Sequence, residues 1–108
     1  MFAVIFEVQP KPGRRQDYLD IAAALRSDLE KIDGFISVER FESLGADGKL
    51  LSLSFWRDAD AVQRWREHER HRHAQTKGRS EIFADYRITV AEVARQYGMT
   101  DRAQSPQR

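Results

Sequence analysis

The chain has 108 residues, of which 41% are hydrophobic and 32% are charged, a balance typical of one globular domain rather than of a disordered segment. Its formal net charge of +1 gives no overall basic field for nucleic acid or anionic lipid, and the lack of cysteine excludes thiol nucleophiles, disulfides and cysteine metal sites. The apolar residues 1–8 are too few for a signal sequence or a membrane span, so we expect a soluble, cytoplasmic protein.

The first two predicted elements are a strand and a helix. Residues 2–8 are rich in β-branched and aromatic side chains, which is typical of a strand, and Pro10 follows closely. From Tyr18 to Ile32, apolar residues recur at spacings of three and four, which indicates a helix with one apolar face. We expect this helix to end before Gly34.

The next two elements are predicted to be strands joined as a hairpin. Residues 35–41 and residues 50–56 both have the composition of strands. The intervening residues 44–48 contain an Asp-Gly pair, which favours a tight turn. The later strand alternates along its length, so that one face carries Leu51, Leu53 and Phe55 and the other carries Ser52, Ser54 and Trp56.

A second helix and a fourth strand complete the predicted domain. Asp58 is a suitable N-cap for the helix, and Gly78 is the residue at which we expect it to stop. Residues 86–93 predict the fourth strand. Residues 99–108 are polar and predict a flexible tail, which leaves one domain over residues 1–98.

The order of these elements predicts a ferredoxin-like α+β fold, βαββαβ, with a four-stranded antiparallel sheet and both helices on one face. The fourth strand nevertheless carries apolar residues on both faces, since Ile88 and Val90 point one way and Ala91 and Val93 the other. An apolar sheet face without helices requires a partner, and a second copy packed sheet to sheet is the simplest one. We therefore expect a homodimer; the alternative is a monomer with a partly apolar open face.

Three histidines belong to the second predicted helix or its end. His68 and His71 share a helix face because they are three residues apart, whereas His73 points elsewhere. No His stands at position 72, so the zinc pattern H-E-x-x-H is absent and no metal site is expected. His73 is expected on the solvated surface, while for His68 and His71 a solvated and a functional role are equal alternatives.

Each of the two tryptophans has two possible roles. Trp65 is most simply the core anchor of the second helix, and it can form a pocket wall at the same time. Trp56 stands beside Ser52 and Ser54, so it either stacks on a ligand or contacts a dimer partner. Basic residues between 64 and 79 alternate with acidic ones, and the third strand lacks the aromatic pattern of RNA-recognition modules, so no nucleic-acid partner is expected.

With these residues in view, residues 1–98 resemble the antibiotic biosynthesis monooxygenase (ABM) domain family, of the dimeric α+β barrel superfamily. The marks of this resemblance are Ser54-Phe55-Trp56, Trp65 with His68 and His71, Ala74-Gln75, Gly78-Arg79, Asp85-Tyr86, and Val93-x-Arg95-x-Tyr97-Gly98.

The resemblance implies a homodimer in which each subunit holds a pocket between its sheet and its helices. Some members of the family are cofactor-independent oxygenases of polycyclic phenols, in which a base deprotonates the substrate and the anion reacts with dioxygen. From this resemblance we expect a cofactor-independent monooxygenase that acts on a small aromatic or polyketide-like substrate. The implied catalytic residues are His71 as base and Arg79 or Tyr86 as oxyanion donor, and the implied substrate-binding residues are Trp56, Trp65, His68 and Phe83.

Other members of the family degrade haem, with a His of the second helix as iron ligand and an Asn of the first strand assisting. Trp65 and His71 are comparable with parts of that site, but this chain contains no Asn, and its first strand offers only Glu7 and Gln9. Haem binding or degradation is therefore the alternative to a site without cofactor. A non-catalytic small-molecule-binding dimer is a further alternative.

Overall fold

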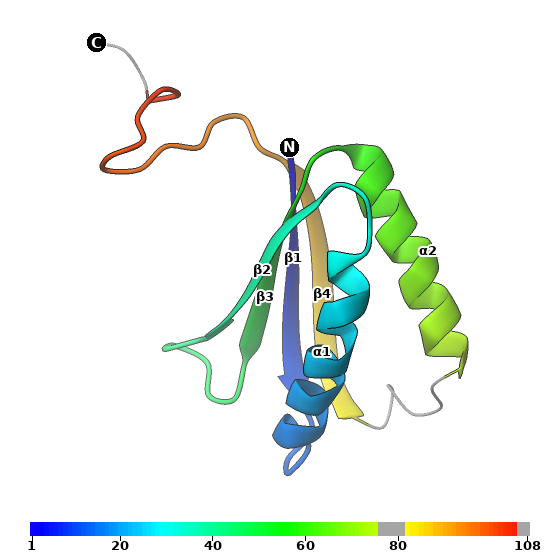
Figure 1. Cartoon of the computed structure of the whole chain (residues 1–108). Coiled ribbons are helices and arrows are strands. Elements are labelled where there is room, and N and C mark those ends of the chain that lie inside the picture. The colour runs from blue at the N-terminus through cyan, green and yellow to red at the C-terminus, as the bar shows by residue number, and fades with distance from the viewer. Residues whose placement is uncertain (76–81, 106–108) are drawn as a thin grey trace.

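The computed structural model describes residues 1–75 and 82–105, and of residues 70–75 it describes the backbone alone. Its elements follow the predicted order βαββαβ (Figure 1). In chain order they are β1 (Phe2–Pro10), α1 (Arg15–Glu30), β2 (Phe35–Glu42), β3 (Leu50–Trp56), α2 (Ala59–Gln75) and β4 (Phe83–Glu92). The ferredoxin-like fold is thus confirmed, and the bounds of β3 are those predicted.

The four strands form one antiparallel sheet in the order β2-β3-β1-β4. Strand β4 begins three residues before the predicted Tyr86, because β1 continues to Pro10 and provides a partner for Phe83. The expected end of α2 at Gly78 lies outside the described residues. No helix in the described part of the chain combines the length and apolar character needed to cross a membrane.

The register of the strands decides which sheet face meets the helices. Across β1 and β3, Val4 is opposite Ser54 and Phe6 is opposite Ser52, and directly opposed residues share a face. Trp56 is fully buried on this same face. The face with the serines and Trp56 is therefore the one beneath α1 and α2, a choice that the sequence left open.

The core beneath the helices is divided into two groups of buried side chains. The Val8 cluster consists of Val8, Tyr18, Ala22, Leu50 and Ile82. The Trp56 cluster consists of Leu29, Val38, Trp56, Ala61 and Val62. Helix α1 contributes to both clusters, but the two sheet rows between them present Ser52 and Ser54 at the centre, where small hydroxyl side chains leave room.

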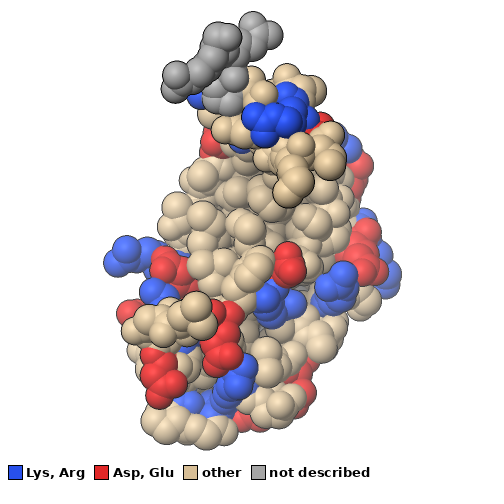
Figure 2. Space-filling view, turned by 90° about the vertical axis from the view of Figure 1, so that its left-hand side faces the viewer, with Lys and Arg blue, Asp and Glu red and all other residues tan. Residues whose placement is uncertain are grey.

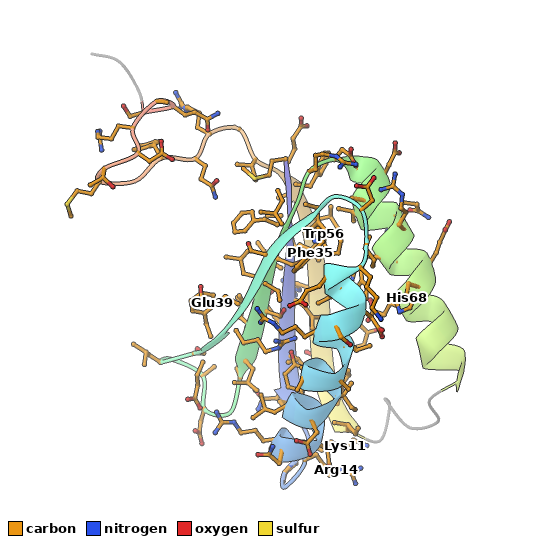
Figure 3. All side chains as sticks on the ribbon, viewed as in Figure 1. Lys11, Arg14, Phe35, Glu39, Trp56 and His68 are labelled. Atoms are coloured by element: carbon orange, nitrogen blue, oxygen red, sulfur yellow. The ribbon has the colours of Figure 1, made fainter. Side chains whose placement is uncertain are left out.

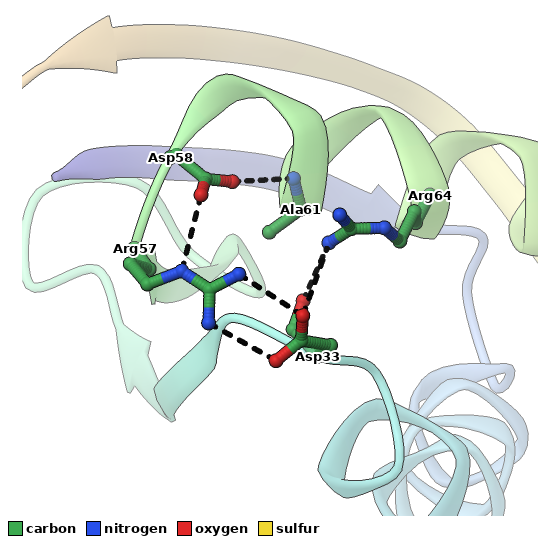
Figure 4. Close-up of polar contacts among 5 residues, drawn as sticks. All are labelled: Asp33, Arg57, Asp58, Ala61 and Arg64. Carbon is green, nitrogen blue, oxygen red and sulfur yellow. Dashed lines mark hydrogen bonds and ion pairs between the residues drawn. The ribbon is translucent and has the colours of Figure 1, made fainter.

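Local contacts join the turn between α1 and β2 to the turn between β3 and α2. The backbone N–H of Ala61 donates to Asp58 Oδ1 at 2.9 Å, which confirms Asp58 as the N-cap of α2. Arg57 donates to both carboxylate oxygens of Asp33, at 3.0 and 3.1 Å, and Arg64 donates to the Asp33 carbonyl at 2.9 Å (Figure 4). Gly34 has a φ of 95°, which favours glycine, and a Cβ there would lie 2.5 Å from that of Ala61.

The sheet face opposite the helices carries no element of the described chain. Figure 2 shows an uncharged area in the upper part of this side, with Lys, Arg, Asp and Glu side chains at its middle, lower part and edges. The side chains on this face include Ala3, Ile5, Leu51, Leu53, Phe55 and Ala91. Beyond β4, the chain leads away from the sheet (Figure 1) and includes a turn in which the Gly98 N–H donates to the Asp101 carbonyl at 2.6 Å.

Candidate functional site

A pocket of about 880 Å³ lies between the sheet and the two helices, in the gap between the Val8 and Trp56 clusters. Its floor consists of the two central rows of the sheet, with Val4 and Phe6 beside Ser54 and Ser52. One wall is the apolar face of α1, and the opposite wall is α2. This cavity, hereafter the central pocket, is large enough for a small organic molecule.

One end of the central pocket is closed by a stack of aromatic rings. Trp65 lies over Trp56 with ring centroids 6.2 Å apart, and Phe35 meets Trp56 edge-on at 5.3 Å (Figure 3). Trp56 Nε1 donates to Ser54 Oγ at 2.9 Å, which satisfies the buried indole and fixes its orientation. Trp65 lines the pocket, whereas Trp56, one of the predicted substrate-binding residues, lies behind it with 0% exposure.

The other end of the pocket is closed by a second aromatic group. Phe6, Tyr18, Phe83 and Tyr86 pack edge-on or tilted with ring centroids 5.8–6.4 Å apart. Phe83 and Tyr86, both predicted as site residues, line the pocket, and Tyr86 is 58% exposed. Phe6 and Tyr18 were not predicted, although the inward alternation of β1 already indicates that Phe6 shares a face with Val4 and Val8.

His68 occupies a different place from the one predicted for a substrate-binding residue. Its ring stacks on Trp65 with centroids 5.8 Å apart, and its Nε2 lies 3.5 Å from Asp28 Oδ2 of α1. Figure 3 shows this side chain between the two helices. His68 is not among the described lining residues, so its contacts are with Trp65 and with Asp28 of α1 rather than with the cavity.

Two of the predicted catalytic residues cannot be placed. Arg79 lies outside the described residues, and the side chain of His71 lies outside them as well, although its backbone belongs to α2. The pocket-lining residues of α2 are Val62, Trp65, Arg66 and Glu69. Continuing this spacing by one helical turn predicts position 73, rather than position 71, on the same stripe of the helix.

Charged and polar groups also reach the pocket. Arg40 of β2 lies opposite Ser52 on the helix-covered face, and Arg66, Glu69 and Asp85 line the pocket as well. Asp85 Oδ1 accepts the N–H of Tyr86 at 2.9 Å. Arg40 was not predicted; the signal was a charged residue at an inward position of a strand, two residues after the buried Val38.

The next question is whether the side chains of the pocket could act as ligands for a metal ion or a haem iron. Within the described part of the chain, no group of three His, Cys, Asp or Glu side chains has a metal-binding arrangement. The lining residues that the structure describes include no His, so they offer no imidazole to a haem iron. The expected haem ligand His71 belongs to the side chains left undescribed.

Comparison with known proteins decides the family. Residues 1–77 match the family described as "Antibiotic biosynthesis monooxygenase". The chain belongs to this family. It is 50% identical over 93 residues to a protein of Pyricularia oryzae named "Jasmonate monooxygenase ABM"; the matched region covers 86% of this chain and 43% of that relative. The chain thus spans less than half the length of this relative.

Several solved structures have the same fold at much lower identity. MhuD of Mycobacterium tuberculosis, a heme-degrader solved with two hemes bound, is 15% identical, with a TM-score of 0.73 over 91% of this chain and 100% of that one. SnoaB of Streptomyces nogalater, a cofactor-independent oxygenase, is 11% identical, with a TM-score of 0.71 over 88% of this chain and 94% of that one. At these identities the likeness establishes the fold alone.

Proposed function

We propose that the chain is a monooxygenase that oxidises a small ring compound, aromatic, polyketide-like or jasmonate-like, held in the central pocket. The observation that carries this proposal is a cavity of about 880 Å³ with aromatic rings at both ends, in a member of the ABM family. The relative of 50% identity is named as a monooxygenase, which supports the reaction class. Apolar walls of this kind hold a flat ring and exclude water from it.

The proposed reaction needs no cofactor because the substrate supplies the electrons. A base removes a proton from an activated CH₂ group, beside a phenol or a ketone, and the resulting carbanion reacts with dioxygen. The CH₂ carbon becomes a carbonyl, one oxygen atom enters the product and the other leaves as water. The four electrons taken from the substrate reduce O₂ fully, so atoms and electrons balance.

The roles of base and oxyanion donor are also proposals. A histidine in the last turns of α2 is a suitable base, since an imidazole titrates near neutral pH. The family resemblance favours His71, and the helical spacing of the lining residues favours His73. The Tyr86 hydroxyl and Arg79 are the proposed donors to a developing oxyanion, and Trp65 and Phe83 are the proposed ring contacts.

We further propose that two copies associate through the open sheet face. Apolar residues of β1, β3 and β4 stand side by side there, and Glu7, Glu39 and Arg87 stand on the same face (Figure 2). An apolar surface of this kind is characteristic of an interface. A two-fold dimer would cover it without obstructing the central pocket, which lies on the opposite side of the sheet.

The function is tested by oxygen consumption and by isotope incorporation. Purified protein, treated with a chelator, is supplied with ¹⁸O₂ and with anthrone-like phenols and jasmonate; we expect one labelled oxygen atom in the product. Ser52→Leu, which places a larger side chain on the pocket floor, should abolish turnover while the protein stays folded. Ser27→Leu, on the exposed side of α1, is the matched control and should keep turnover. Unlabelled product, or an active Ser52→Leu variant, would contradict the proposal.

A further inference from the structure

The position of Arg40 is unusual for a strand arginine. It lies on the helix-covered face of the sheet, directly opposite Ser52 and two residues beyond the buried Val38. Its side chain lines the central pocket and is half-buried. A guanidinium is thus held at the floor of a cavity whose walls are largely apolar and aromatic.

Among the residues that the structure describes, no acidic side chain forms an ion pair with Arg40, although Glu69 and Asp85 line the same pocket. Its Nε is buried and has no hydrogen-bond partner among the residues that the structure describes. Glu42, the acidic residue nearest along the same face of β2, lies 3.7 Å from Arg15 instead. Within the described ranges, no carboxylate comes within 4.0 Å of the Arg40 guanidinium. A desolvated donor in such a place is costly unless something in the pocket accepts its hydrogen bond.

We infer that Arg40 binds a carboxylate carried by the substrate, and thereby determines which compounds the pocket selects; this inference rests on the proposed function. The planar guanidinium offers parallel N–H donors that match the two oxygens of a carboxylate. The substrate class is then a small apolar ring compound with one carboxylate, whose ring lies against the aromatic walls. Jasmonate, which appears in the name of the relative of 50% identity, is an anion of this class.

Arg66 is the rival cation in the pocket. It belongs to α2 and its side chain is exposed, so its interaction with an anion is weakened by water and by salt. Arg40 lies deeper, at the sheet, where a hydrogen-bonded ion pair is stronger. The inference therefore assigns the recognition of the carboxylate to Arg40 and leaves Arg66 outside it.

The test compares the affinity of the protein for a carboxylic acid with its affinity for the uncharged methyl ester of that acid. Isothermal titration calorimetry measures the binding of jasmonate and of its methyl ester to the wild-type protein, Arg40→Gln, Arg40→Lys and Arg66→Gln. We expect the wild type to bind the acid about 10- to 100-fold more tightly than the ester, as for hydrogen bonds to a charged group. Arg40→Gln should bind both alike, with the ester bound as in the wild type, which also shows that the pocket is intact. Arg40→Lys should recover part of the preference, and Arg66→Gln should keep it.

The outcomes separate this inference from the proposed function. If the wild-type protein binds the acid and the ester equally, the pocket still binds the ligand as proposed, but the role of Arg40 is overturned. An undiminished preference for the acid in Arg40→Gln, or its loss in Arg66→Gln alone, overturns that role as well. Wild-type protein that binds neither compound rejects jasmonate-like compounds as ligands of the pocket, and the inference with them.

Discussion

Trp56 and Trp65 stack with an angle of 23° between their planes, yet only Trp65 contacts the central pocket. The inner ring belongs to β3 and is fully buried, while the outer ring belongs to α2 and is half-buried. The pair therefore joins the hydrophobic core to the candidate binding site through one aromatic contact.

Alanine substitutions should separate these two roles. Trp56→Ala removes a fully buried ring and should lower the free energy of unfolding by about 3–5 kcal/mol. Trp65→Ala should cost about 2 kcal/mol, since part of its ring already faces the pocket, and it should also weaken ligand binding. Urea unfolding measures both values. Equal losses would show that Trp65 is as fully packed as Trp56.

Two glycines provide a matched test of the junction between β2 and α2. Gly34 and Gly13 both have positive φ, 95° and 77°, so alanine is strained at either position. Only at Gly34 would the new Cβ meet another atom closely, the Cβ of Ala61 at 2.5 Å; at Gly13 nothing lies within 4 Å. Gly13→Ala should lower the free energy of unfolding by about 1 kcal/mol and Gly34→Ala by about 3 kcal/mol or more. Similar melting temperatures for the two variants would be the contrary result.

The ion pairs around Asp33 predict a particular dependence on pH. Hydrogen bonds from the Arg57 guanidinium and its charge lower the pKa of Asp33, and the Ala61 N–H, followed by Arg57, lowers that of Asp58. A carboxyl whose pKa is lower in the folded state stabilises the protein above its unfolded pKa of about 3.9, and this stability is lost as pH falls through the folded pKa.

The melting temperature should therefore fall less between about pH 7 and about pH 2 for Asp33→Asn than for the wild type. Asp47→Asn, in an exposed turn away from this network, is the control and should follow the wild type. Salt should reduce the effect, because the pairs are exposed. Identical acid declines in the wild type and Asp33→Asn would mean that the pair adds nothing to stability.

The proposed dimer is tested by one charge on the open sheet face. Leu53→Lys places an ammonium at the centre of that face and should convert a dimer into a monomer at micromolar concentration. Leu44→Lys makes the same change at a fully exposed turn residue and should leave the dimer intact. Light scattering after size-exclusion chromatography gives both masses. A wild-type protein that is already monomeric would refute the interface.

The histidines of α2 are tested in pairs. If the base belongs to this helix, one of His71→Ala and His73→Ala should lower the rate of oxygen uptake by about 100- to 10,000-fold, while the other retains it. Loss in His71→Ala would follow the family resemblance, and loss in His73→Ala would follow the helical spacing of Trp65, Arg66 and Glu69. Full activity in both variants would exclude a histidine base here.

Hydrophobic spacing, together with turn and capping residues, was sufficient to predict the order of elements, the N-cap Asp58 and the bounds of β3. It could not decide which face of β3 meets the helices, because both faces carry large apolar side chains and the answer depends on the packing of Trp56 against Leu29, Ala61 and Val62. The early start of β4 has a similar cause, since its first residue pairs with the end of β1. Arg40 was missed because the sequence does not show that it pairs with Ser52 on the face beneath the helices.

Helix α1 packs on the sheet through Tyr18 and Ala22 in the Val8 cluster and through Leu29 in the Trp56 cluster. Between these two contacts, Leu25 lines the central pocket and belongs to neither cluster. We therefore expect a larger or smaller residue in place of Leu25 to change the room in the pocket while both clusters stay intact. Tyr18, Ala22 and Leu29 line the same pocket, so these three residues belong to the core and to the cavity at once, whereas Leu25 belongs to the cavity alone.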